Sequence, residues 1–262
     1  MPIDQQAPVA LFLFAHQDDE FGVYPLLDAY RRQGVRVRCA YLTDGSVGKV
    51  RSVTRNAESL AVLGQLGVDA ADVAFAGAQL GIPDAGVPQH LARAANWIAQ
   101  WLISAGTPLA IHVMAWEGGH HDHDAIHAVT VTLAHDMGLL DRVTQFSLYN
   151  GARIPAPLFR ILSPLRENGN ATRSKVRWAM RVRCMRYCLS YPSQRNTWVG
   201  LFPFAVLHYV LRGVQELQRV SMARIDQRPH AGRLYYESRK FFTWEKMQAA
   251  LAAWRAGRIG SG

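Results

Sequence analysis

Two short segments of this 262-residue chain concentrate side chains that can bind a metal ion and move protons. The first is His-Gln-Asp-Asp-Glu at residues 16–20, and the second is His-His-Asp-His at residues 120–123. A catalytic zinc ion takes about three histidine or carboxylate ligands and leaves one position for water. His16 and Asp19 are three residues apart across a turn and can converge on one point, which His123 can also reach. We therefore predict one catalytic zinc ion at these three residues.

The other polar side chains of the two segments suit the remaining steps of an amide hydrolysis. A free carboxylate beside a bound water can act as a general base, and Asp18 is the candidate. His120 is placed to stabilise the developing oxyanion, to protonate the leaving nitrogen, or to do both. Asp122 could hold the ring of His120 and raise its basicity, or could simply cap the helix that it begins. His127 lies four residues after His123 and is either an outer partner of the site or a packed histidine.

The elements around the two segments must bring them together. An apolar run at residues 9–15 directly precedes the first segment, and another at 109–115 ends shortly before the second. Both runs are typical of strands buried in a parallel sheet. Because the carboxyl ends of parallel strands meet at one edge, both segments should lie at that edge. This alternation predicts an α/β fold with a doubly wound, mostly parallel sheet. The remaining predicted elements are strands at 35–42, 73–76 and 143–149, and helices at 22–32, 52–66, 89–104 and 122–136.

The second half of the chain is strongly basic and harder to interpret. Residues 1–150 hold 9 Lys and Arg against 15 Asp and Glu, a net charge of −6, whereas residues 151–262 hold 20 against 5, a net charge of +15. We predict a polar loop at 163–174, a basic helix at 175–189 and a more apolar helix at 204–220. The predicted organisation is thus a core at 1–150 and a basic, mainly helical extension at 151–262 that packs on the core and completes the substrate site.

The two segments resemble the signature of the PIG-L/LmbE family of zinc-dependent N-deacetylases. The family pattern is His-Pro-Asp-Asp-Glu after the first strand and Gly-His-x-Asp-His after a later one. Residues 16–20 and 119–123 follow this pattern, except that Gln17 replaces the proline, which should loosen the turn. The resemblance covers about residues 9–150 and implies a Rossmann-like, LmbE-type fold. Three shorter family motifs occur in the same order: Leu-Thr-Asp-Gly at 42–45, Arg-Asn-Ala-Glu at 55–58 and Leu-Gly-Ile-Pro-Asp at 80–84.

The resemblance also implies residue roles and a substrate class. It places Arg55 and Asp84 facing a sugar, and the segment Tyr-Pro-Ser-Gln at 191–194 resembles a family element near the substrate, which makes Gln194 a candidate contact. Residues 234–237 resemble a late segment of some bacterial members, although packing of a C-terminal strand is the simpler interpretation. The reaction implied is removal of acetate from an N-acetyl amino sugar. The implied roles in the two segments are zinc ligation by His16, Asp19 and His123, proton transfer by Asp18, and oxyanion stabilisation or acid catalysis by His120.

The composition of the chain indicates the cellular compartment in which the protein works. No apolar stretch reaches the ~20 residues that span a bilayer. The first apolar run lacks the basic flank of a signal peptide. The three cysteines are odd in number and poorly spaced for disulfides, as expected in a reducing compartment. We therefore expect a cytoplasmic enzyme.

The basic second half of the chain is compatible with more than one binding partner. Arg173, Arg177 and Arg181 have helical spacing and lie near the apolar run at 198–204, so this region could meet lipid or a lipid-linked saccharide at the inner membrane face. It could equally be a solvated surface beside a buried helix. No nucleic-acid-binding motif is present. The leading hypothesis is a zinc-dependent N-deacetylase acting on an N-acetyl amino sugar. The basic half would favour an anionic or lipid-linked form of this substrate. The alternatives are a non-catalytic glycan- or lipid-binding protein on the same scaffold and a metal-dependent ester or phosphate hydrolase.

Overall fold

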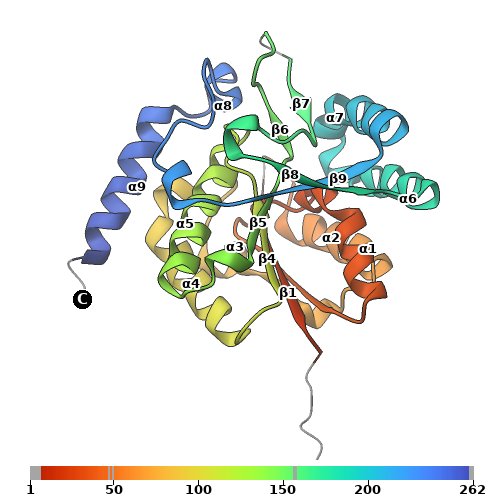
Figure 1. Cartoon of the computed structure of the whole chain (residues 1–262), viewed down its shortest axis with the longest axis horizontal. Coiled ribbons are helices and arrows are strands. Elements are labelled where there is room, and N and C mark those ends of the chain that lie inside the picture. Colours follow the sequence, from red (N-terminus) through yellow and green to blue (C-terminus); the bar gives the residue numbers. More distant parts are fainter. Residues whose placement is uncertain (1–6, 47, 49, 156–157, 260–262) are drawn as a thin grey trace, which may run out of the picture.

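The computed structural model describes residues 7–46, 48, 50–155 and 158–259, and its centre is a seven-stranded sheet of order β3-β2-β1-β4-β5-β9-β8 (Figure 1). The first five strands in this order run parallel, while β9 is antiparallel to β5 and β8 is antiparallel to β9. This confirms the predicted α/β fold with a mostly parallel sheet. The strands are β1 Val9–Phe14, β2 Arg36–Tyr41, β3 Val73–Phe75, β4 Ala110–Met114, β5 Val143–Phe146, β8 Ala171–Lys175 and β9 Val214–Arg219.

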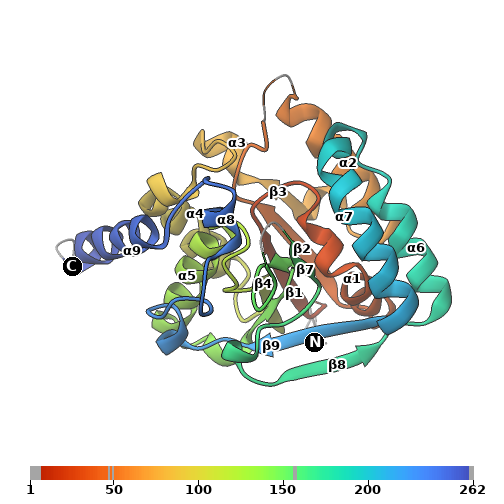
Figure 2. The same ribbon diagram turned by 90° about the horizontal axis from the view of Figure 1, so that it is seen from above.

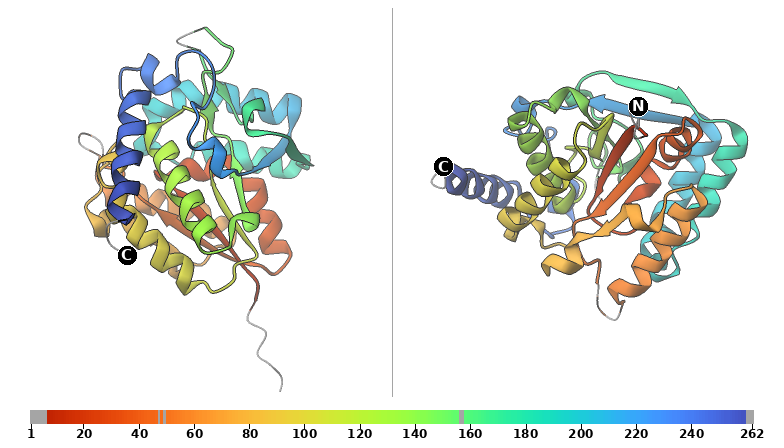
Figure 3. Two further views of the ribbon diagram at one scale, coloured as in Figure 1. Left: turned by 60° about the vertical axis from the view of Figure 1, so that its left-hand side comes forward. Right: turned by 90° about the horizontal axis from the view of Figure 1, so that it is seen from below.

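Helices cover both faces of the sheet, which is why its central strand is apolar on both sides. One layer contains α1 Tyr24–Arg32, α2 Ser52–Gln65, α6 Trp178–Cys188 and α7 Arg195–Leu207 (Figure 2). The other contains α3 Ala76–Leu80, α4 Leu91–Ser104, α5 His121–Asp136 and α9 Trp244–Ile259 (Figure 3). A hairpin of β6 Tyr149–Asn150 and β7 Arg160–Ile161 and the short helix α8 Tyr235–Ser238 lie above the carboxyl edge of the sheet.

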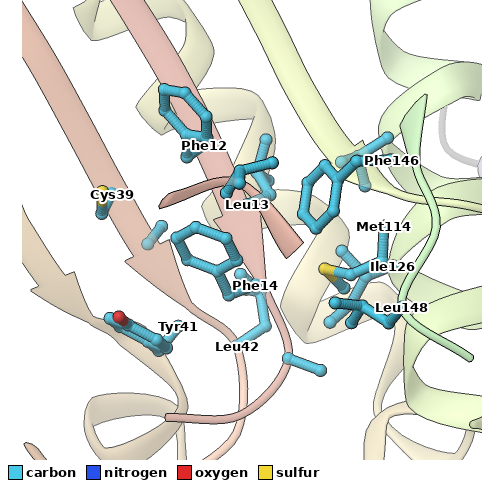
Figure 4. Close-up of a cluster of buried hydrophobic side chains, with 14 of the residues drawn as sticks. Phe12, Leu13, Phe14, Cys39, Tyr41, Leu42, Met114, Ile126, Phe146 and Leu148 are labelled. Atoms are coloured by element: carbon cyan, nitrogen blue, oxygen red, sulfur yellow. The ribbon is translucent and has the colours of Figure 1, made fainter. Parts of the chain in front are cut away.

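The core fixes the end of β1, from which the first polar segment emerges. Phe14 is fully buried between Tyr41 and Phe146, with ring centroids 5.3 and 6.0 Å away (Figure 4). Complete burial of one such side chain contributes about 1.5–3 kcal/mol. The packing of Phe14 therefore holds the backbone at the start of the first polar segment in a fixed position.

Two predicted elements in the second half are wrong in part. The expected loop at 163–174 contains most of β8, and the expected helix at 204–220 covers the end of α7, a π-helical turn at 208–212 and then β9. The cause lies in β9, whose buried side chains Glu216 and Gln218 are polar. A strand that buries polar groups against dedicated partners lacks the apolar alternation by which strands are recognised.

Two smaller expectations also need correction. Arg173 lies on β8 and Arg177 precedes α6, so these two residues do not share a helix face with Arg181. Residues 235–238 form the helix α8 and not a C-terminal strand. Two strands from the second half extend the sheet of the first half, whereas the division at residue 150 stays a prediction.

Candidate metal centre

The carboxyl ends of β1 and β4 bring the two polar segments to the same edge of the sheet, as the alternation predicted. The first segment folds its own turn. The Asp19 carboxylate accepts hydrogen bonds from the backbone N–H groups of Ala15 and His16 at 3.0 and 2.7 Å, and the Glu20 carboxylate accepts one from Asp18 at 2.9 Å. Asp18 adopts φ 113°, a conformation that non-glycine residues rarely hold. Such strain persists where the surroundings over-determine it, and it is frequent at functional sites.

Gln17, which replaces the family proline, does not leave this turn loose. Its side chain is buried and donates a hydrogen bond to Asn56 Oδ1 on α2 at 2.6 Å. Its backbone carbonyl accepts from the Arg55 guanidinium at 2.7 Å. The Gln17 side chain thus holds the turn against α2 by a hydrogen bond, whereas the proline of the family pattern restricts the turn by its ring.

Three of the predicted ligands converge. His16 Nδ1 lies 3.3 Å from His123 Nε2, and the two oxygens of Asp19 lie 3.5 Å from His16 Nδ1 and 3.1 Å from His123 Nε2. Ligands bonded tetrahedrally to zinc at 2.0–2.1 Å are separated by about 3.4 Å. The three side chains are almost completely buried. The spacing and chemistry of these donors therefore fit a zinc ion.

His120 lies beside this set. Its nitrogen donors come within 4.8 Å of those of His16 and His123, and its ring centroid is 4.6 Å from that of His16. Its side chain is 15% exposed and that of Asp84 is 17% exposed, against 2% for His123, so His120 and Asp84 lie toward the opening of the site. His120 Nδ1 accepts a hydrogen bond from the Asp122 backbone N–H at 3.2 Å, which leaves Nε2 to carry the ring proton.

The carboxylate of Asp122 has a different partner from the one expected. Its Oδ2 lies 3.1 Å from His16 Nε2 but 3.9 Å from His120 Nδ1, and its Oδ1 accepts from the Val87 N–H. His16 thus offers Nδ1 to the metal position while Nε2 is held by a carboxylate, an arrangement that orients a metal ligand. The expectation that Asp122 holds the ring of His120 is corrected, because the geometry gives that carboxylate to His16.

This correction yields a prediction about metal affinity. Asp122→Asn should weaken metal binding by about 10–100-fold, because an amide cannot both accept from Val87 and accept from His16 as a carboxylate does. Competition with a chelator of known affinity measures the change. If turnover fell while metal affinity stayed unchanged, Asp122 would serve His120 and not His16.

Asp18 forms an ion pair with a buried arginine. Arg55 Nη2 is 3.4 Å from Asp18 Oδ1, and Nη1 is 3.1 Å from Asp84 Oδ2. Burial raises the pKa of Asp18 to about 8, and the charge of Arg55 opposes this shift. A divalent cation nearby would lower the same pKa and favour the carboxylate. Arg55 itself is buried, and its guanidinium also donates to the backbone carbonyls of Gly45 at 2.8 Å and Gln17 at 2.7 Å.

The charges of the remaining groups are mutually dependent. Burial alone would lower the pKa of His16, but the carboxylates of Asp84 and Asp19 raise it well above its usual range. Burial lowers the pKa of the His120 imidazole, and the charge on His16 lowers it further. The metal-free site therefore holds a proton on His16 and a neutral His120. A cation would replace that proton, so metal binding should weaken as the pH falls.

Gln194 and His127 lie outside the cluster. Tyr191 at the start of the same segment donates a hydrogen bond to Glu20 at 2.8 Å, which anchors the segment to the first motif. No hydrogen bond or ion pair joins the Gln194 side chain to the cluster within the described part of the chain. His127 is buried and its Nδ1 bonds the Met114 carbonyl at 2.8 Å, so it packs in the core and does not face the metal position.

Two tyrosines near the cluster were not predicted as site residues. The Tyr149 ring centroid is 5.7 Å from that of His123, and Tyr235 from α8 packs on Tyr149 at 5.6 Å. Glu117 is buried and accepts from the backbone N–H groups of Leu148 and Tyr149, which holds the tyrosine in place. Tyr149 ends the strand predicted at 143–149, so its place at the carboxyl edge was the available signal.

Comparison with known proteins gives one family. Residues 11–134 match the model of the PIG-L family, described as GlcNAc-PI de-N-acetylase. This match confirms the resemblance that the motifs carry. No curated protein matches the chain significantly.

Several solved structures share the fold. A triple mutant of a deacetylase in the teicoplanin biosynthetic pathway has a TM-score of 0.61 at 18% identity, covering 81% of this chain and 97% of its own. The N,N'-diacetylchitobiose deacetylase of Pyrococcus horikoshii has a TM-score of 0.55 at 14% identity, covering 81% and 84%. GalB, the 4-carboxy-2-hydroxymuconate hydratase of Pseudomonas putida KT2440, has a TM-score of 0.51 at 14% identity, covering 80% and 94%. At these identities the likenesses show a shared fold.

Proposed function

We propose that this chain is a zinc-dependent N-deacetylase that hydrolyses the acetamide of an N-acetyl amino sugar to an amine and acetate, and the match of residues 11–134 to the PIG-L family model supports this proposal. One observation carries this proposal above the others. His16, Asp19 and His123 converge at the spacing of zinc ligands, and the same turn carries Asp18, whose carboxylate is held by the buried Arg55. A binding protein without catalysis would not need the complete set.

Each residue of the site has a task in this reaction. A zinc ion at the site would lower the pKa of a water molecule from ~15.7 to about 7. Asp18 accepts the proton of the attacking water, and Arg55 holds its carboxylate in position. His120 donates the hydrogen on Nε2 to the carbonyl oxygen as that oxygen gains charge. The proton that Asp18 takes from the water then passes to the departing nitrogen, which leaves as a neutral amine and returns Asp18 to its carboxylate form.

A substrate screen tests the proposal. Purified protein is incubated with zinc and a panel of N-acetylated amino sugars, and mass spectrometry identifies those in which one acetyl group is replaced by hydrogen. Free acetate is measured in parallel, and a chelator followed by added zinc should abolish and restore the reaction. Acetate and phosphate esters of the same sugars form the comparison. Release from the esters alone would overturn the N-deacetylase proposal in favour of an ester or phosphate hydrolase.

An anionic or lipid-linked amino sugar fits the second half of the chain best. Residues 168–215 contain eight Lys and Arg and no Asp or Glu. The helices α6 and α7 and the turn at 208–212 also expose large apolar side chains, which we call the α6–α7 face. Exposed apolar groups within a basic segment suit attachment to an anionic membrane. None of the described helices is long and apolar enough to span one. The α6–α7 face consists of Trp178, Val182, Leu189, Val199, Phe204, Leu207, Val210 and Leu211.

Vesicle binding tests the α6–α7 face. The protein should sediment with vesicles that contain anionic phospholipid and remain in solution with neutral vesicles. Val199→Glu with Leu211→Glu should reduce sedimentation by about tenfold, because both side chains are 70% exposed and would place charge against lipid. The matched control is Val53→Glu with Ile103→Glu, at sites 77% and 68% exposed on α2 and α4. Equal losses in the two double variants would contradict attachment through this face.

A further inference from the structure

A second charged feature is a cavity of about 420 Å³ beside the hairpin and the edge strands. Five arginines line it, and Glu216 is the one acidic residue in its lining. We call it the arginine pocket. Its arginines are Arg153, Arg160, Arg166, Arg173 and Arg212.

These arginines come from separate parts of the fold. Arg160 lies on β7, Arg166 begins the 3-10 turn at 166–168, and Arg173 lies on β8. Arg212 ends the π-helical turn that leads into β9. The antiparallel pairing of β8 with β9 sets Arg173 opposite Glu216, so the pocket depends on the sheet and not on a local run of sequence.

A buried carboxylate orients two of the guanidinium groups. The Glu216 side chain is 3% exposed and accepts from Arg173 Nε at 2.5 Å and from Arg212 Nη2 at 2.8 Å. A guanidinium has five N–H donors, so each arginine keeps several for another partner. Arg173 and Arg212 are 67% and 42% exposed, and those remaining donors are accessible. Glu216 therefore acts as an anchor that leaves both arginines able to bind an anion.

Two of the other three arginines leave the pocket with uncompensated charge. Arg153 pairs with Glu167 at 2.7 Å and holds φ 56°, a left-handed conformation unusual for a side chain of its size. Arg160 and Arg166 form no side-chain hydrogen bond or ion pair with any other described residue. Five positive charges against Glu216 give the lining a net charge of +4. Cations gathered in this way repel one another, and an anion in the cavity would relieve the repulsion.

We propose that the arginine pocket binds a ligand carrying a diphosphate or two neighbouring phosphoryl groups. Guanidinium groups match phosphate oxygens in two-point hydrogen bonds, and five of them around a cavity of about 420 Å³ offer donors to more than one phosphoryl group. Arg153 also lines a neighbouring cavity of about 350 Å³ with Tyr235 and Leu158. That cavity offers room for the organic part of the same ligand. The proposal does not depend on the deacetylase reaction, because the pocket contains none of the residues assigned to it.

Calorimetry with inorganic pyrophosphate tests the pocket. Metal-depleted protein at low ionic strength should bind pyrophosphate saturably and more tightly than orthophosphate. Arg160→Gln with Arg166→Gln should weaken binding by about tenfold or more, because both residues offer free guanidinium groups. The control is Arg51→Gln with Arg195→Gln, which removes two exposed arginines outside the pocket and should change the affinity less than twofold. Melting temperatures verify that all variants are folded.

Two further measurements distinguish a soluble ligand from a lipid headgroup, and binding at the arginine pocket from binding at the metal centre. Binding of a nucleoside diphosphate more tightly than pyrophosphate indicates a soluble ligand that extends into the neighbouring cavity, whereas stronger binding to vesicles with a polyphosphorylated headgroup indicates a lipid. His123→Ala should retain pyrophosphate affinity, which distinguishes the pocket from the metal centre. The proposal is overturned if pyrophosphate does not bind, or if the control pair weakens binding as much as the pocket pair.

Discussion

Asp18→Asn should bind zinc as the unaltered protein does, yet lose about 10²–10⁴-fold in turnover on an acetylated amino sugar. The amide has the shape of the carboxylate but cannot accept the proton of the attacking water. Asparagine also tolerates positive φ better than most residues, so the turn at φ 113° should survive the change. Zinc content by atomic spectroscopy and turnover by acetate release measure the two effects separately.

The experiment distinguishes a base from a structural group. Asp18 contacts Arg55, so its replacement could act by releasing that guanidinium. Arg55→Lys is the comparison, because it keeps the charge but loses the fixed hydrogen bonds to Asp18 and Asp84. We expect a smaller loss from Arg55→Lys than from Asp18→Asn. Full activity of Asp18→Asn would remove Asp18 from the role of base.

His123→Ala should lose the metal ion, and with it all but background turnover. Two further ligands remain, and they cannot form a site of three protein ligands with an open position. The nitrogen of His123 contacts only the two other proposed ligands, at 3.3 Å and 3.1 Å, so the substitution removes no other hydrogen bond in the described structure. Zinc content after dialysis and acetate release give the two measurements.

A histidine one turn along the same helix provides the matched control. His127 is as buried as His123, and His127→Ala removes the same atoms from α5. That variant should be less stable, because the Met114 carbonyl loses its partner, but it should retain zinc. Zinc loss from both variants would mean that disruption of α5, and not removal of a ligand, empties the site.

The sequence predicted most of the first half because its signals are local. The apolar run of β1, the motif that follows it and the helix beginning near His121 each lie within a few consecutive residues. Left-handed glycines also end helices where expected, as Gly67 does with φ 82°. Parallel-sheet geometry then places the two motifs together without further information.

The features that could not be predicted depend on partners distant in sequence. Asp122 Oδ2 lies 3.1 Å from His16 Nε2 and 3.9 Å from His120 Nδ1. Residue spacing in the sequence cannot predict which of the two histidines is the nearer partner. Tyr235 reaches Tyr149 only through the packing of α8. Likewise, the sequence does not identify β9 as a strand, because the buried Glu216 carboxylate is compensated by ion pairs with Arg173 and Arg212, which lie outside the strand.

The position of β9 has a consequence for how the protein is made. A ribosome delivers β5 long before β9, and β9 is the strand that pairs with its outer side. Until then the nascent chain presents an open row of backbone donors and acceptors, to which a neighbouring chain can add. Emergence of β9 from the ribosome therefore ends the period in which nascent molecules can associate through this edge.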